Sequence, residues 1–200
     1  MDQTQAQKNL QIIKDMIEKT KKETAESGYF FIFIGIFAMI MTYIISLLSR
    51  FHLPHLIIPA MIFMLVGSGI IGYLTINRKE KRDEIKSYPK TISYSVWFAC
   101  SVSIILTTFV FPFINLYPFD LVPVFASLFI GVAVFSTGVI FEFRAIILCS
   151  ISWWAGAVLM AYVNASWEVY IMLAVIFLGW ILPGLILNKK YRSREIVHEA

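Results

Sequence analysis

The chain carries at residues 28–49 the stretch GYFFIFIGIFAMIMTYIISLLS, which contains no Asp, Glu, Lys, Arg or His. An α-helix rises about 1.5 Å per residue, so about 20 apolar residues cross the roughly 30 Å hydrocarbon core of a membrane. Five more stretches of this kind follow, and none has an Asp, Glu, Lys, Arg or His near its middle. The six stretches lie at roughly Gly28–Ser49, Pro54–Ile76, Thr91–Phe113, Phe119–Phe141, Ala145–Val163 and Trp167–Leu187. The sequence therefore predicts an all-α polytopic membrane protein with six transmembrane helices.

The composition agrees with a chain that lies mostly in lipid. Apolar residues make up 58% of the 200 residues and charged residues 15%, whereas a soluble domain carries about 25% charged residues. Because the six spans take up most of these residues, we expect no separate soluble catalytic domain. The net charge of +4 reflects topology rather than nucleic-acid binding, because the basic residues cluster between the spans. Residues 1–27 are too polar for a signal peptide, so the first span is expected to be an uncleaved anchor.

Basic residues fall almost entirely on one side of the predicted spans. If successive segments alternate sides, sixteen Lys and Arg residues share one side and only Arg50 lies on the other. The positive-inside rule then places both termini in the cytoplasm. The opposite loops, at about 50–53, 114–118 and 164–166, are so short that consecutive helices must be antiparallel neighbours. We expect three antiparallel hairpins over residues 28–188, followed by a basic cytoplasmic tail at 189–200.

The segment before the first span is predicted to be a cytoplasmic amphipathic helix within residues 1–27. Its apolar residues Leu10, Ile13 and Ile17 recur at helical spacing. The segment carries five basic and five acidic residues, and a helix lying on anionic lipid should be more basic than that. We expect it to dock on the protein's own loops or on a partner protein.

Polar and aromatic side chains within three of the spans form a candidate pocket or pathway. Ser and Thr can bond carbonyls of their own helix, so helix packing explains them without any ligand. A buried indole N–H needs a hydrogen-bond acceptor, and the Trp residues could instead line a pocket for an apolar or aromatic ligand. The candidate residues are Trp97, Ser101, Thr108, Trp153, Trp154 and Trp180.

Small residues spaced four apart predict close helix packing, because they allow two backbones to approach. These candidates are Ser68 with Gly72, Ser127 with Gly131, and Ser152 with Gly156. Internal packing is the simpler interpretation, and a homodimer face on one of them is the alternative. Pro183 and Gly184, late in the sixth span, form a candidate hinge, since proline kinks a helix. A static bend supported by neighbouring helices explains them equally.

Metal and disulfide chemistry are not indicated. His52 and His55 flank Leu53 and Pro54 with no acidic or Cys residue close in sequence, so we expect interfacial side chains. Cys100 and Cys149 fall in the predicted cytoplasmic half of the membrane, where the reducing compartment disfavours a disulfide. We expect buried thiols that act as small apolar groups.

Four short segments resemble a known family. They are Asn9–Lys14 (NLQIIK), Gly28–Phe31 (GYFF), Phe141–Arg144 (FEFR) and Trp180–Lys189 (WILPGLILNK). The family comprises uncharacterised six-span bacterial inner-membrane proteins of about 200 residues. The resemblance covers nearly the whole chain, implies a bacterial inner membrane, and carries over no functional residue.

The spans also limit the possible functions. Proton-coupled transporters and voltage sensors need intramembrane charge, and intramembrane proteases need paired acids, a Ser/His set or a metal. We expect a non-catalytic protein, without cofactor or metal, that acts in the lipid bilayer by association. Its partner is a second copy, or another protein bound through residues 1–27, and not nucleic acid. A carrier or channel for a neutral or lipid-like solute is the alternative, and an intramembrane enzyme is the third hypothesis.

Overall fold

The computed structural model describes residues 28–80, 88–163 and 165–189, and these ranges contain helices and turns but no strand. Six of the helices are long and apolar enough to cross a membrane, which confirms the prediction of six apolar spans. Those spans are Gly28–Arg50, His55–Leu74, Thr91–Phe113, Phe119–Ile140, Arg144–Tyr162 and Trp167–Lys189. The architecture is that of a multi-pass helical membrane protein. The amphipathic helix expected within 1–27 and most of the basic tail lie outside the described residues.

Several spans consist of more than one helical element, because short π and 3-10 turns interrupt them. A span in lipid must pair its backbone groups internally, which is why these interruptions remain helical. The elements in order are α2 (Gly28–Arg50), α3 (Pro54–Glu80), α4 (Tyr88–Ile105), the π-turn η1 (Leu106–Val110), α5 (Phe111–Phe113), the 3-10 turn η2 (Phe119–Leu121), α6 (Val122–Ile140), α7 (Arg144–Tyr162), α8 (Ala165–Ile176) and the π-turn η3 (Phe177–Ile181). Residues 182–189 continue the last span as a helix.

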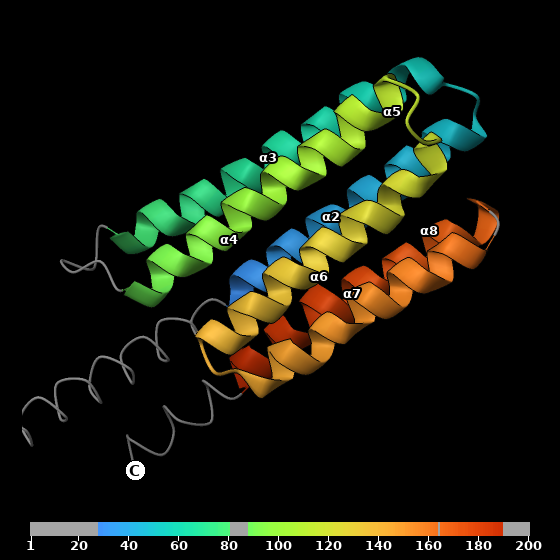
Figure 1. The fold of residues 1–200 in the computed structure, drawn as a ribbon. Helices are drawn as coiled ribbons and strands as arrows, with labels where there is room; N and C mark the ends of the chain where they lie inside the picture. The colour runs from blue at the N-terminus through green and yellow to red at the C-terminus, as the bar shows by residue number, and fades with distance from the viewer. Residues whose placement is uncertain (1–27, 81–87, 164, 190–200) are drawn as a thin grey trace, which may run out of the picture.

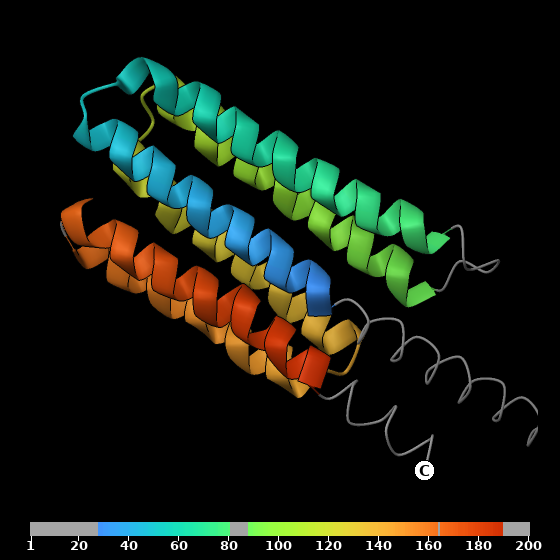
Figure 2. The same ribbon diagram turned by 180° about the vertical axis from the view of Figure 1, so that it is seen from behind.

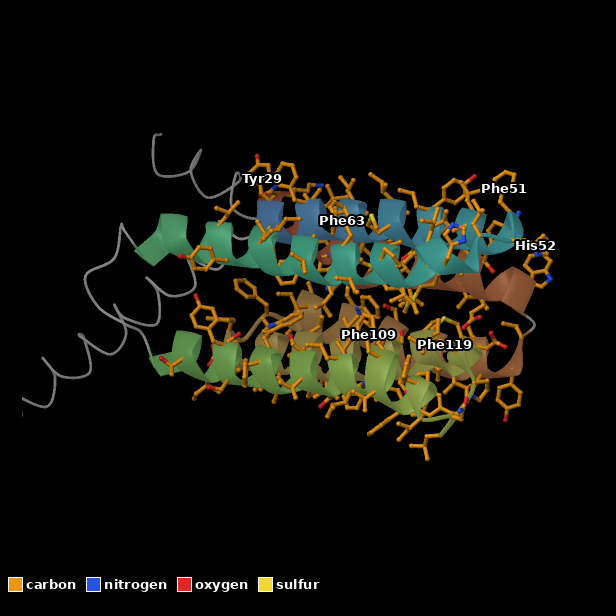
Figure 3. All side chains as sticks on the ribbon, turned by 90° about the horizontal axis from the view of Figure 1, so that it is seen from above. Tyr29, Phe51, His52, Phe63, Phe109 and Phe119 are labelled. Atoms are coloured by element: carbon orange, nitrogen blue, oxygen red, sulfur yellow. The ribbon has the colours of Figure 1, made fainter. Side chains whose placement is uncertain are left out.

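The helices pack in three layers, with α3 and α4 on one side, α2 and α6 between, and α7 and α8 on the other side (Figures 1 and 2). Extensive contacts run in a row from α3 to α2, α8, α7, α6 and α4. Within the described residues α2 is the only element with which α3 makes extensive contact. Figure 3 shows α3 over α2 and apart from α4. The chain of contacts therefore bends back on itself: α3 and α4 are its first and last helices, and both lie on the same side of the bundle.

The core lies where α2, α6, α7 and the sixth span meet. Its buried apolar side chains include Ala38, Val134, Ile146, Trp153, Ile176 and Leu187. At one end of the bundle Gly28 lies against Gly184, so both described ends of the chain meet there. Arg50 lies at the opposite end, where its guanidinium donates to the hydroxyl of Tyr170 over 3.4 Å.

Three helices end with a non-glycine residue in the left-handed backbone region. His52, Asn115 and Glu142 have φ values of 55°, 58° and 56°. After each of them an N–H bonds a carbonyl five residues back, in the Schellman arrangement that satisfies the last helical carbonyls. These bonds are Leu53 to Leu48 at 3.0 Å, Leu116 to Phe111 at 3.0 Å and Phe143 to Gly138 at 2.8 Å. The same cap therefore allows short turns after α2, α5 and α6.

Candidate functional site

Two of the candidate tryptophans meet in the core. Trp153 of α7 is fully buried and Trp180 of η3 is 6% exposed. Their ring centroids lie 5.1 Å apart with an interplanar angle of 62°, which is an edge-to-face contact. Gly179 provides the space for this pair, because a Cβ there would overlap the Trp153 indole nitrogen. Neither indole nitrogen has a hydrogen-bond partner among the described residues.

The other two tryptophans join neighbouring helices. The Trp97 indole of α4 donates to Thr137 Oγ1 of α6 over 3.0 Å, and that hydroxyl donates to the carbonyl of Ala133 over 2.7 Å. The Trp154 indole of α7 donates to the carbonyl of Leu128 in α6 over 3.4 Å. Both indoles therefore have acceptors within the bundle. Their polar atoms serve helix packing in this conformation.

The structure does not gather all the candidate pocket residues in one place. Ser101 is exposed on α4, whereas Thr108 is buried in η1. Trp97 packs against the edge of the core that contains Trp153 and Trp180. The exposed Ser101 is thus separated by its orientation from the buried Trp pair.

Two of the three predicted small-residue pairs are used inside the bundle. The Ser127 hydroxyl donates to the carbonyl of Trp153 over 3.2 Å. A Cβ on Gly131 would lie 2.6 Å from the Trp154 indole nitrogen, and one on Gly156 would overlap Val175. The hydroxyl of Ser152 donates to the carbonyl of Cys149 in its own helix, over 2.7 Å. The interfaces of α7 with α6 and with α8 therefore depend on glycine.

The third pair, on α3, is placed differently. The Ser68 hydroxyl donates to the carbonyl of Leu65 in its own helix over 2.9 Å. A Cβ added to Gly72, or to the neighbouring Gly69, would meet no atom within 4 Å. Gly67 is the small residue that α3 uses internally, because a Cβ there would lie 2.6 Å from the Phe37 ring of α2.

Two π-turns occur in the described helices, and a proline follows each at the same distance. Pro112 follows η1 and Pro183 follows η3. Proline has no N–H, and its ring crowds the carbonyl four residues back. A π-turn inserts one residue just before the proline and relieves this crowding. Both prolines therefore explain the local helix geometry.

The Tyr117 hydroxyl replaces a backbone donor that is lost at the π-turn of the third span. The carbonyl of Thr107 has lost both of its usual donors, because the N–H of Phe111 bonds Leu106 and Pro112 has none. The Tyr117 hydroxyl donates to this carbonyl instead. Burial raises the pKa of Tyr117 above its ordinary value. Sequence reasoning missed this role, although Pro112 within an apolar span signals a carbonyl that needs another donor.

Pro183 and Gly184 are both buried, and a Cβ on Gly184 would lie 2.8 Å from the carbonyl of Gly28. A Cβ on Gly35 would lie 2.8 Å from the Ile181 side chain. The end of the sixth span thus approaches the start of α2 backbone to backbone at Gly184, whereas at Gly35 the Ile181 side chain lies against the α2 backbone.

Charged groups gather at the end of the bundle that holds Arg50. Glu168 in α8 has a buried carboxylate oxygen without a hydrogen-bond partner among the described residues, and Asp120 lies near it. Cys100 and Cys149 are both free. Within the described part of the chain no three His, Cys, Asp or Glu side chains are grouped so that they could hold a metal ion.

No known protein family, curated protein or solved structure matches this chain. The candidate site must therefore be interpreted from its own geometry.

Proposed function

We propose that this chain is a non-catalytic protein of the bacterial inner membrane that acts by helix association through α3. Three antiparallel hairpins with both termini in the cytoplasm belong to this proposal. The segregation of sixteen basic residues from Arg50 supports the orientation.

The observation that carries the proposal is the use of glycine. The chain has ten glycines, and eight of them leave no room for a Cβ without contact with a neighbouring residue. Gly69 and Gly72 are the two exceptions. A glycine inside a helix costs about 1 kcal/mol relative to alanine, and in a membrane its common compensation is close approach of a second helix.

The rest of α3 fits this role. None of its described side chains is buried. Its contact with α2 uses Gly67 and the Phe37–Phe63 ring pair, whose centroids lie 6.3 Å apart. The apolar residues Val66 and Ile70, which flank Gly69 on the helix surface, are exposed. We define Val66, Gly69, Ile70 and Gly72 as the α3 face.

The test replaces both glycines of the α3 face by leucine and measures association of the full chain. Labelled copies in liposomes report self-association by energy transfer, and purification from native membranes reports a different partner. We expect the Gly69→Leu/Gly72→Leu variant to lose one of these signals by tenfold or more. Ala155→Leu is the matched control, because Ala155 is an exposed small residue on α7. Equal association of both variants and the wild type in both assays would refute the proposal.

A partner that binds through residues 1–27, and not through the α3 face, can be distinguished by a deletion. Deletion of residues 1–27 should then release a co-purified protein, whereas the glycine variant should retain it.

A carrier for a neutral or lipid-like solute is the second candidate. Two observations favour it: α3 and α4 lack extensive mutual contact, and Ser101 is exposed on α4. Solute flux in liposomes that Ser101→Leu abolishes would support the carrier, and its absence over a panel of neutral solutes and lipids would oppose it.

A further inference from the structure

The π-turn of the sixth span leaves one backbone carbonyl without its usual donors. The N–H of Leu182 bonds the carbonyl of Phe177, and Pro183 has no N–H, so neither residue donates to the carbonyl of Leu178. In the third span the carbonyl at the same position accepts from the Tyr117 hydroxyl. Leu178 lies about midway along its span, at a depth where an unpaired backbone group is costly.

Two buried indole N–H groups lie beside the same turn. Trp153 is 0% exposed and Trp180 is 6% exposed, and neither indole nitrogen has an acceptor among the described residues. A Cβ on Gly179, the residue after Leu178, would overlap the Trp153 nitrogen. The Trp153 donor therefore lies against the peptide unit that contains the freed carbonyl.

The contact between the two rings does not replace both missing acceptors. An edge-to-face arrangement of Trp153 and Trp180 can direct at most one N–H toward the partner ring, and such a contact is weaker than a hydrogen bond. At least one fully buried donor and one freed acceptor are therefore left at the same place in the core. A buried polar group of this kind is usually paired with protein or with an ordered water.

We propose that a single water molecule binds at η3, where it accepts a hydrogen bond from the Trp153 indole and donates one to the carbonyl of Leu178. The two protein groups define this ligand, because an indole N–H only donates and a carbonyl only accepts. A charged ligand would have no counter-charge, since the sequence between Glu168 and Lys189 contains no Asp, Glu, Lys, Arg or His.

The position of the water follows from the break in the helix. A break in the ladder of backbone hydrogen bonds is where a water can insert, and here the break is produced by the proline and the extra residue of the π-turn. The water gives the sixth span what the Tyr117 hydroxyl gives the third, and it joins α7 to η3. This inference does not depend on association through α3.

The test is NMR of the full chain in lipid nanodiscs, with ¹⁵N-labelled tryptophan and assignment of the indole signals by single Trp→Phe variants. We expect a rotating-frame Overhauser cross-peak between water and the indole proton of Trp153, with the sign opposite to that of proton exchange. Trp97 should show none, because its indole is bonded to Thr137. Trp167, exposed at the end of the sixth span, is the positive control for contact with solvent.

A matched pair of proline variants tests the bridge itself. Pro183→Ala permits a regular helix, in which the Leu182 N–H bonds Leu178, so the Trp153 cross-peak should fall to the level of Trp97. Pro112→Ala, the same change in the third span, should leave it as in the wild type. Absence of the cross-peak at Trp153 in the wild type would overturn the proposal, whether or not Pro183→Ala folds. An undiminished cross-peak in a folded Pro183→Ala variant would overturn it as well.

Discussion

Replacement of His52 by glycine should stabilise this protein. His52 has φ = 55° and occupies the position after the end of α2 where the Schellman cap requires a left-handed residue. That conformation costs a side-chain-bearing residue about 1–2 kcal/mol. Glycine avoids this cost but loses about 0.5–1 kcal/mol more conformational entropy on folding. The net gain is about 0.5–1 kcal/mol, because the backbone bond from Leu53 to Leu48 is retained.

Two matched variants separate this effect from the loss of a side chain. His55 is also exposed but lies in α3 with helical geometry, so His55→Gly should lose up to about 1 kcal/mol. Asn115 has φ = 58° in an equivalent cap, and asparagine tolerates this region, so Asn115→Gly should change stability little. The measurement is the free energy of unfolding in mixed detergent micelles, followed by tryptophan fluorescence. A His52→Gly variant that is no more stable than the wild type would contradict a strained backbone at His52, and so would an equal gain in stability from Asn115→Gly.

Other perturbations test the packing. Gly156→Ala should lower the free energy of unfolding by about 1–3 kcal/mol, because the added Cβ would overlap Val175. Gly69→Ala should instead raise it by up to about 1 kcal/mol in the isolated protein, because the added Cβ meets no atom. Equal free energies of unfolding for the two variants would contradict these contacts. A double-mutant cycle of Trp97→Phe and Thr137→Val should give a coupling of about 0.6–1.7 kcal/mol for the 3.0 Å bond, and strict additivity would show that this bond contributes nothing. The raised pKa of Tyr117 means that the folded state holds this proton more tightly, so its contribution is complete below about pH 10 and is lost as the pH rises through the folded-state value. Stability measured from pH 8 to 12 should therefore fall less steeply in Tyr117→Phe than in the control Tyr162→Phe.

The number and extent of the spans could be predicted from sequence because the solvent imposes them. A bilayer requires long uncharged stretches and internally paired backbone, and both requirements are local in sequence. The stretch 28–49 therefore predicts α2 without any knowledge of its neighbours. The end of α2 could also be predicted locally, because the charged Arg50 directly follows the apolar stretch.

The arrangement of the spans was less accessible. Loop length indicates which consecutive helices can be neighbours, but it does not indicate that α2 packs on both α3 and α8. Those partners depend on shape, such as the contact of Gly28 with Gly184, which lie far apart in the chain. The spacing of small residues predicted close packing without specifying which pair would face inward.

The candidate tryptophans show the same division. Their positions away from the ends of the spans were visible in the sequence, as was the need of each N–H for an acceptor. The sequence could not predict that the indole of Trp97 donates to Thr137 and that of Trp154 to the carbonyl of Leu128. Nor could it predict that the rings of Trp153 and Trp180 contact each other. Hydrogen-bond pairing between helices is fixed by rotation of each helix about its axis, and apolar helices with weak periodicity carry little information about that rotation.

The sequence by itself determined that this chain forms six apolar helices, because transfer of charge and unpaired backbone into lipid is costly wherever it occurs. The tertiary structure alone decided which glycines lie against neighbouring atoms and which face open space, since those atoms belong to distant segments of the chain. Gly69 and Gly72 are indistinguishable in sequence from Gly156 and Gly179. Only packing leaves the first two facing open space and places the last two against Val175 and Trp153.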